Sequence, residues 1–312
     1  MEKEVQSILN TITGINLKRT AELQPALEPN KPVFKVVPDK ELRRLQAEAF
    51  KKERIKIEQR PPFMNPRKEI DVELARNPEI APVMTHNLLF IDTSAYTRSE
   101  KLNKDKLIVV RDTEGTLREA RHGERERAIQ IAFPAEGRTM FPSNFFKPES
   151  IENALKNCRY SYILDRLCLQ YEPDDPEFIR MTRQIYNHIL ENEEFDSLRG
   201  TRHFGSLAFY LALCRREEPL MLDMLQRYLV LDACDYLSLL DKLHMPRQYK
   251  RPDYKLDNVK KILEKYVSKR SRKTTEVNKL KEAMNNVRSR GLAKVIEDNQ
   301  SERALLENYL NE

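Results

Sequence analysis

The sequence predicts a mainly α-helical protein: a helical bundle or short solenoid-like array, with a small β-hairpin-containing module and an extended N-terminal arm. Three observations support this fold class. Only 7 of the 312 residues are glycine, roughly 2% against a usual share of about 7%. Apolar residues recur at helical spacing through the C-terminal half, and convincing strand patterns are confined to one region. The predicted regions are an N-terminal helix, proline-rich connector and charged helical arm (1–79), a small mixed α/β module (80–148), a helical body (149–245) and a basic helical C-terminal region (246–312).

The first region contains two helical patterns separated by prolines. Apolar residues recur at helical spacing from Val5 to Ile12, and Gly14 is suited to end that helix. Four prolines between residues 20 and 38 each remove a backbone donor, which predicts an extended connector. Asp39, a candidate N-cap, begins a helix reaching Arg60 in which 13 of 22 residues are charged. A helix this polar is usually a solvated arm, although in a ribonucleoprotein it could lie along RNA or a partner.

The strand patterns lie between residues 80 and 148. LLFID (88–92) and KLIVVR (106–111) are rich in branched residues, and the second is joined to TLREA (116–120) by a short loop. Gly115 suits the left-handed position of such a hairpin loop. A charged helix is expected from about Gly123 to Ala132. Arginines here alternate with glutamates, which favours a salt-linked surface over phosphate contact; they are Arg118, Arg121, Arg125, Arg127 and Arg138.

From Ser150 to about Leu243 the pattern is helical throughout, with short polar connections that predict antiparallel packing of neighbouring helices. The longest apolar run, Leu207 to Cys214, has eight residues, whereas a membrane span needs about 20. We therefore expect no membrane span. The cysteines form no C-x-x-C pair and lie in apolar helical patterns, so we expect buried free thiols rather than disulfides or zinc ligands. They are Cys158, Cys168, Cys214 and Cys234.

The net charge of +6 is unevenly distributed. Between Lys242 and Lys294 there are 17 Lys and Arg against 5 Asp and Glu, a net charge of +12, which leaves −6 for the other residues. Two apolar stripes in this segment predict helices that dock by one face and present cations outward, which suits a phosphate backbone; the alternative is a solvated helix face. Arg199 and Arg202, before an apolar helix, are candidates for an interface anchor or a phosphate contact. The full set predicted to bind RNA is Arg199, Arg202, Lys260, Lys261, Lys265, Lys269, Arg270, Arg272, Lys273, Arg288 and Arg290.

The residues suggest no catalytic, cofactor-binding or metal-binding site. GTRHFGSL (200–207) has the glycine spacing of a phosphate-binding loop but has Ser206 where lysine is needed, so its glycines are expected to be close-packing positions. His188, Asp196 and Ser206 could be drawn as a triad, but the G-x-S-x-G turn is missing. The acids at 174, 175 and 177 more simply begin a helix near Pro176 than bind a cation. We therefore predict a protein that is not an enzyme and has no cofactor or small-molecule substrate.

Five segments carry a resemblance to a known family. They are EVQSILNTITGINL (4–17), IVVRDTEGTLREA (108–120), ERERAIQIAFPAEGR (124–138), CLQYEPDDPEFI (168–179) and EFDSLRGTRHFG (194–205). In order and spacing, from about residue 4 to 245, the chain resembles the family of animal mitochondrial small-subunit ribosomal proteins numbered twenty-two. The resemblance implies a structural constituent of the mitochondrial ribosome in the mitochondrial matrix. It implies small-subunit ribosomal RNA and neighbouring ribosomal proteins as partners, and no catalysis or cofactor. Family members are made with a presequence, and we expect this chain to be a mature form without one.

Three functional hypotheses follow. In the first, the basic C-terminal helices and scattered arginines bind ribosomal RNA, and the acidic body and N-terminal segment bind proteins. In the second, the chain is a helical adaptor that binds only proteins, which the charge of −6 outside the basic segment favours. The third, a hydrolase, lacks a recognisable catalytic constellation.

Overall fold

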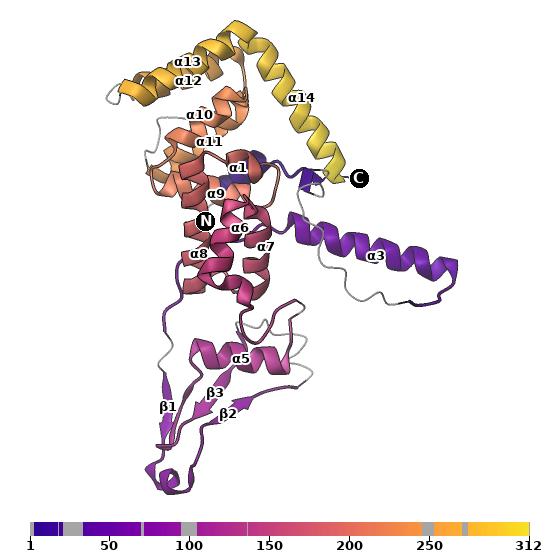
Figure 1. The fold of residues 1–312 in the computed structure, drawn as a ribbon, viewed down its shortest axis with the longest axis vertical. Coiled ribbons are helices and arrows are strands. Elements are labelled where there is room, and N and C mark those ends of the chain that lie inside the picture. Colours follow the sequence, from indigo (N-terminus) through magenta and orange to yellow (C-terminus); the bar gives the residue numbers. More distant parts are fainter. Residues whose placement is uncertain are drawn as a thin grey trace. The chain divides into compact units, whose positions relative to one another are not determined.

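The computed structural model describes residues 3–17, 19–20, 34–69, 72–94, 105–135, 137–244, 253–269 and 274–311. The described chain is mainly helical with one small antiparallel sheet, which confirms the predicted fold class (Figure 1). It divides into two compact units. Unit 1 comprises residues 1–63, 154–165 and 180–312, and unit 2 comprises residues 64–153 and 166–179. The boundaries fall within α6 (Pro148–Lys156), α7 (Tyr160–Gln170) and α8 (Pro176–Asn192), so we describe each unit by itself.

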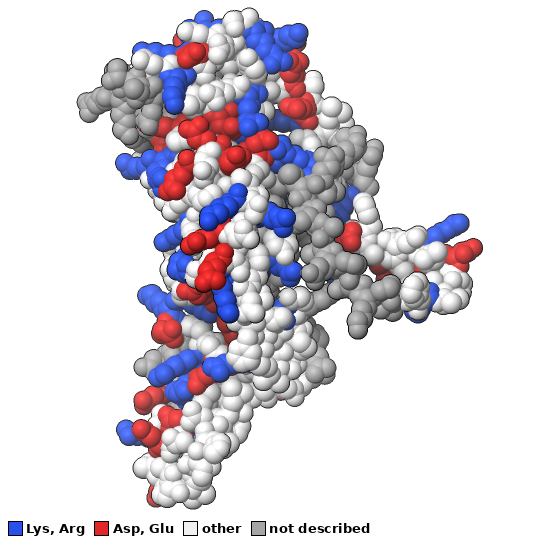
Figure 2. Space-filling view, viewed as in Figure 1, with Lys and Arg blue, Asp and Glu red and all other residues white. Residues whose placement is uncertain are grey.

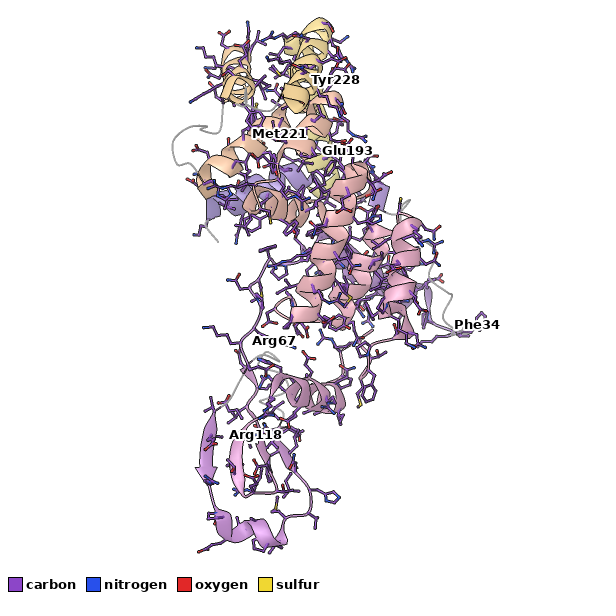
Figure 3. All side chains as sticks on the ribbon, turned by 60° about the vertical axis from the view of Figure 1, so that its left-hand side comes forward. Phe34, Arg67, Arg118, Glu193, Met221 and Tyr228 are labelled. Atoms are coloured by element: carbon purple, nitrogen blue, oxygen red, sulfur yellow. The ribbon has the colours of Figure 1, made fainter. Side chains whose placement is uncertain are left out.

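Unit 1 is built around two helices that are buried on most sides. α9 (Phe204–Leu213) is apolar all round, and eight of its ten residues are buried, as expected of a helix at the centre of a core. α11 (Val230–His244) packs against α9 and against α10 (Glu218–Gln226). Side chains from all three helices, such as Leu207, Met221 and Leu237, have no exposed surface (Figure 3 labels Met221).

The N-terminal helix completes this core. α1 (Lys3–Thr13) buries Val5, Ile8 and Ile12 against α9 and α11. Gly14 follows with φ +45°, the left-handed conformation predicted for the end of this helix. Most of the predicted proline-rich connector lies outside the described residues.

α3 (Asp39–Glu58) matches the predicted charged arm, with one correction at its start. The N-cap is Pro38, and Asp39 is the first helical residue. Proline suits this position because its fixed φ is compatible with entry into a helix and its missing N–H costs no helical hydrogen bond. The helix makes no extensive contact with another described element, and none of its described side chains is buried.

Three further helices form the C-terminal part of unit 1: α12 (Leu256–Lys269), α13 (Thr274–Arg290) and α14 (Leu292–Asn311). α13 packs on α10, whereas α12 and α14 pack on α11. Gly291, at φ +90°, makes the turn between α13 and α14.

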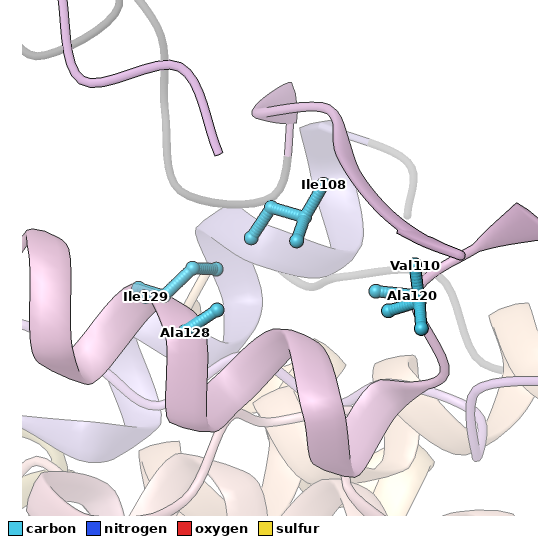
Figure 4. Close-up of a cluster of buried hydrophobic side chains, with 5 residues drawn as sticks. All are labelled: Ile108, Val110, Ala120, Ala128 and Ile129. Carbon is cyan, nitrogen blue, oxygen red and sulfur yellow. The ribbon is translucent and has the colours of Figure 1, made fainter. Parts of the chain in front are cut away.

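Unit 2 contains a four-stranded antiparallel sheet in the order β1-β4-β3-β2. Gly115 has φ +83° in the β3–β4 hairpin, as predicted, and a Cβ there would lie 2.1 Å from the Asn77 carbonyl oxygen. α5 (His122–Ala132) covers one sheet face with Ala128 and Ile129. These contact a cluster made with Ile108, Val110 and Ala120 (Figure 4). The strands are β1 (Glu73–Arg76), β2 (Leu88–Ile91), β3 (Ile108–Arg111) and β4 (Thr116–Glu119), and short 3-10 helices of this unit span Pro78–Val83 and Asn144–Phe146. A further 3-10 helix, Phe195–Ser197, belongs to unit 1.

The cysteine prediction is correct for bonding and partly wrong for burial. All four are free, but only Cys234 is buried; Cys168 is half-buried, and Cys158 and Cys214 are exposed. Cys158 has φ 51° at the turn after α6, and Cys214 is the C-cap of α9, where the chain leaves the core. The apolar periodicity of the surrounding sequence therefore did not show that Cys158 and Cys214, which lie at helix ends, are exposed. Among the described residues, no helix is both long and apolar enough to cross a membrane.

Candidate RNA-binding surface

α12 separates its apolar and basic side chains onto different faces. Val259, Leu263 and Tyr266 are buried. Lys260, Lys261 and Lys265 are exposed. This is the arrangement that the apolar stripe predicts, because residues three and four positions apart share one side of a helix. The three lysines therefore lie on the exposed side of the helix, where a polyanion can reach them.

α13 continues the same pattern. Leu280, Met284 and Val287 are buried, whereas Lys279 and Lys281 are exposed. Lys and Arg side chains are numerous at the top of Figure 2, where Figure 1 places α13. Exposed cations of this C-terminal part are Lys255, Lys260, Lys261, Lys265, Lys279, Lys281, Arg288, Arg290 and Lys294.

The two predicted arginines of α13 have partners within unit 1. Arg288 Nη2 lies 2.5 Å from Glu264 Oε1 of α12. The Arg290 guanidinium lies over the Tyr228 ring, 4.4 Å from its centroid; Figure 3 labels Tyr228. Both arginines remain exposed. An exposed ion pair of this kind contributes little to stability, so its arginine can exchange that partner for a phosphate.

Four predicted positions fall at the gap between α12 and α13. Arg270, Arg272 and Lys273 lie outside the described residues, as does the side chain of Lys269. Their role in RNA binding stays a prediction.

Arg199 is held inside an ionic cluster of unit 1. Its Nη2 lies 2.5 Å from Asp223 Oδ2, and its guanidinium lies 4.7 Å from the centroid of the Phe204 ring. Asp223 also accepts a hydrogen bond from Arg227 Nε at 2.8 Å. Only 13% of the Arg199 side chain is exposed. This geometry suits the interface-anchor alternative within the chain, and it leaves little of the guanidinium for a phosphate.

Arg202 is similarly engaged, with Asp165 of α7. Its Nε donates to Asp165 Oδ1 at 2.9 Å, and His203 Nε2 lies 2.8 Å from the same oxygen. Burial opposes ionisation of this carboxyl, but the hydrogen bonds and charges of His203 and Arg202 lower the pKa of Asp165 below its usual value. Arg202 Nη1 also donates to the Gln59 carbonyl oxygen at 3.3 Å, which ties the chain after α3 to α7.

The three residues that could be drawn as a triad have separate partners. His188 Nδ1 lies 3.0 Å from the Tyr160 hydroxyl, and Asp196 accepts a hydrogen bond from Arg19 at 2.7 Å. Ser206 donates its hydroxyl hydrogen to the Pro61 carbonyl oxygen at 3.1 Å. These contacts connect structural elements and do not assemble a nucleophile with a base.

The glycines of 200–207 and the acids before α8 also have structural roles. A Cβ on Gly205 would lie 2.3 Å from Thr13 Oγ1, so this glycine is a close-packing position between α9 and α1, as predicted. Asp175 Oδ1 accepts a hydrogen bond from the Glu177 backbone N–H at 2.8 Å and thereby caps α8. The expected use of this acid at a helix start is confirmed.

Unit 2 holds arginine clusters that support the salt-linked interpretation. Arg118 donates two hydrogen bonds of 2.8 Å to Glu124, and Arg138 Nη1 lies 2.7 Å from Glu172 Oε1. Figure 2 shows the two charge signs interspersed over much of the visible face. By itself, the net charge of −6 outside the basic segment favours a protein-binding surface. Several acids that contribute to this charge are instead paired with arginines of the same chain.

The sequence reasoning missed two half-buried arginines. Arg67, in unit 2, lies 2.6 Å from Glu126 and 2.7 Å from Asp175 (Figure 3). Arg303, in α14, lies 2.5 Å from Asp232 and 2.9 Å from Asp235 of α11. Their partners are 59 to 108 residues away along the chain, and no local spacing pattern could have identified them.

Comparison with known proteins places most of the chain in one group. The sequence model of the mitochondrial 28S ribosomal protein S22 family matches residues 1–245. The chain is similar to the small ribosomal subunit protein mS22 of Mus musculus, with 35% identity, and to that of Bos taurus, with 33% identity. Each comparison extends over 245 residues and covers 78% of this chain and 66% of the relative. The chain thus spans just under two thirds of the length of these relatives.

Proposed function

Because the chain belongs to the mitochondrial 28S ribosomal protein S22 family, we propose that it is a structural constituent of the small subunit of the mitochondrial ribosome. In this role it works in the mitochondrial matrix and binds small-subunit ribosomal RNA and neighbouring ribosomal proteins. It catalyses no reaction and uses no cofactor.

The RNA contact is assigned to the exposed cations of α12 and α13. The observation that carries this assignment is the orientation of α12: its apolar face is buried while Lys260, Lys261 and Lys265 are exposed. Lysines that neutralise phosphates release condensed counterions, so binding to RNA should weaken steeply with salt. The buried face keeps the helix in place while its other face binds.

A charge-removal series on the full chain tests this assignment. The variant Lys260→Gln/Lys261→Gln/Lys265→Gln should bind small-subunit ribosomal RNA more weakly. The slope of log affinity against log salt should fall by about one for each phosphate that the variant no longer neutralises. The matched control, Lys68→Gln/Lys147→Gln/Lys156→Gln, removes the same charge from exposed lysines elsewhere and should keep the parent slope. Equal slopes for the parent and the α12 variant would refute an RNA contact through α12.

Membership of the ribosome is tested separately. A tagged full chain should sediment with the small subunit in a mitochondrial matrix lysate, and ribonuclease treatment should shift it to lighter fractions. Sedimentation away from the small subunit in untreated lysate would contradict the ribosomal role.

A protein-only adaptor is the second candidate. The observation that favours it is the engagement of Arg199 and Arg202 with Asp223 and Asp165, which reduces the number of predicted RNA contacts. If the α12 variant enters the small subunit as well as the parent chain and shows the same salt dependence, this alternative is supported.

A further inference from the structure

We propose that α3 is a second RNA-binding surface, which binds the phosphate backbone of double-helical RNA through one basic face. This inference rests on the proposed ribosomal function and extends it to a helix outside the basic C-terminal region. The face, called here the α3 basic band, consists of Lys40, Arg43, Arg44, Lys51 and Arg54.

The spacing of the band places its side chains on one side of the helix. Successive members are separated by three, one, seven and three residues, and side chains three, four or seven positions apart lie close in direction on a helix of 3.6 residues per turn. Ala47 fills the middle of the band. Glu41 and Glu48 fall beside the band, and Glu58 shares its direction only at the last residue of the helix, so no acid interrupts the band between Lys40 and Arg54. The helix carries only a small excess of cations, but it concentrates them on one face.

Several cations of the band are available. Lys40, Arg43, Arg44 and Lys51 are exposed. Within the described part of the chain, Lys40, Arg43 and Lys51 form no ion pair. Arg44 and Arg54 pair with Glu48 and Glu58 one turn away, at 3.6 and 2.8 Å, contacts that are weak in water. Lys40 and Lys51 are eleven residues apart, about 16 Å along the axis, so the band is long enough for several phosphates.

The exposure of α3 indicates a partner in an assembly. No described side chain of this 20-residue helix is buried, whereas helices in proteins gain most of their stability from packing. Charge complementarity selects a polyanion, because the five members of the band are all cations, and the exposed Phe50 and Ile55 lie at its two edges rather than within it. The band also lacks aromatic side chains that could stack on bases, so we expect it to bind without sequence preference.

The opposite face of α3 offers the competing possibility. Leu42, Leu45 and Ala49 lie about half a turn away from the band, and Leu42 is 43% exposed. This apolar stripe is narrow, but it could dock on a protein. A double variant, Leu42→Ala/Leu45→Ala, removes that stripe and keeps good helix formers in place.

The test uses the full chain and a double-helical RNA hairpin as the probe. The variant Lys40→Gln/Arg43→Gln/Lys51→Gln should bind about tenfold or more weakly at 0.1 M salt, and its slope of log affinity against log salt should fall by about two to three. Glutamine has a helix propensity close to that of lysine and arginine, and circular dichroism should show unchanged helicity. The reverse variant, Glu41→Gln/Glu48→Gln/Glu53→Gln, should bind more tightly.

The outcomes separate this proposal from the ribosomal function. If the α3 variant keeps the parent affinity and slope while the α12 lysine variant loses both, the α3 proposal is overturned and RNA binding by the protein stands. If the parent chain binds no RNA, both fail. If Leu42→Ala/Leu45→Ala blocks entry into the small subunit while the α3 basic variant enters normally, α3 docks on a protein and the proposal is wrong.

Discussion

At the scale of single residues, the partner of a charged side chain decides its role. Arg118 lies among arginines and glutamates whose alternation favours a salt-linked surface and leaves a phosphate site as the alternative. Its two hydrogen bonds to Glu124 resolve this choice, because Arg118 is buried and Glu124 also accepts from the Arg121 backbone N–H at 2.9 Å. Glu124 thus joins β4 to the first turn of α5.

Removing the Glu124 carboxylate should destabilise unit 2 in a pH-dependent way. The hydrogen bonds from Arg118 lower the pKa of Glu124 from 4.5 to about 2. A depressed folded-state pKa stabilises the fold above the unfolded value and loses that effect as the pH falls toward 2. Glu124→Gln should therefore lower the free energy of unfolding by about 1–2 kcal/mol at pH 7, and the difference from the parent should shrink below pH 4.5.

Hydrogen exchange in α5 measures this change locally. Peptides from α5 should exchange faster in Glu124→Gln at pH 7 than in the parent, whereas Glu152→Gln, at an exposed position of the same unit, should leave them unchanged. Equal protection of α5 in Glu124→Gln and the parent would show that the pair does not stabilise this unit.

At the scale of elements, helix contacts depend on positions where two backbones approach closely. Gly205 of α9 is such a position, because an added Cβ would lie 2.3 Å from Thr13 Oγ1 and 3.5 Å from the Leu9 carbonyl oxygen of α1. Thr13 is β-branched and buried, and its hydroxyl donates to Leu9 at 2.6 Å. It has little freedom to move aside.

Gly205→Ala should therefore destabilise unit 1 by about 1–3 kcal/mol through overpacking. Urea unfolding followed by circular dichroism would measure the destabilisation, and adding Thr13→Ala should recover part of it. Gly123→Ala is the control: a Cβ there would meet only the flexible Arg127 side chain, at 4.0 Å, and alanine favours the helix. If the Gly205→Ala protein is as stable as the parent, α1 and α9 can move apart enough to accommodate the added methyl group without loss of unfolding free energy, and the predicted overpacking is contradicted.

The elements that sequence reasoning identified are those with a local signal. The helices α1 and α12 follow from apolar spacing, and the β3–β4 hairpin follows from branched residues around Gly115. β1 (Glu73–Arg76) has no such signal: its four residues are exposed, and its partner β4 lies about forty residues later. Only pairing with a distant strand makes this segment a strand.

The same distinction applies to the candidate site. The outward direction of Lys260 and Lys261 follows from the buried stripe of their own helix. The internal engagement of Arg199 and Arg202 depends on acids 24 and 37 residues away. The positions of basic residues in a sequence contain no information about such pairs. A count of basic residues therefore overestimates the number of cations that can bind RNA.

At the scale of the whole molecule, the segment from Lys242 to Lys294 has a net charge of +12 and the remaining residues have −6. The helices of this segment are attached to the rest of unit 1 by two kinds of contact. Part of the attachment is apolar, through residues such as Val259 and Val287. Part is ionic. Arg303 contacts Asp232 and Asp235, and the Tyr254 hydroxyl donates to Asp235 at 2.8 Å. These contacts join α14 and the segment before α12 to α11.

This ionic anchor predicts that Arg303→Met should loosen the C-terminal helices as a group. Burial alone would lower the pKa of Arg303, but the two carboxylates raise it above its usual value, so the guanidinium is charged at any pH at which the protein is folded. Its removal takes the Arg303 guanidinium away from Asp235, which has no exposed surface. Breaking a buried pair in this way costs about 3–5 kcal/mol.

Hydrogen exchange in α14 should accordingly become much faster in Arg303→Met, and RNA affinity should fall although no exposed lysine has changed. The compensating variant Arg303→Met/Asp232→Asn/Asp235→Asn removes the uncompensated charges and should restore much of the protection, because removing both partners costs less than removing one. If Arg303→Met keeps parent-like protection in α14, the apolar contacts alone hold the basic segment on the body. A deletion of residues 242–312 cannot separate these cases, because it removes the RNA-facing lysines and uncovers Asp235 at the same time.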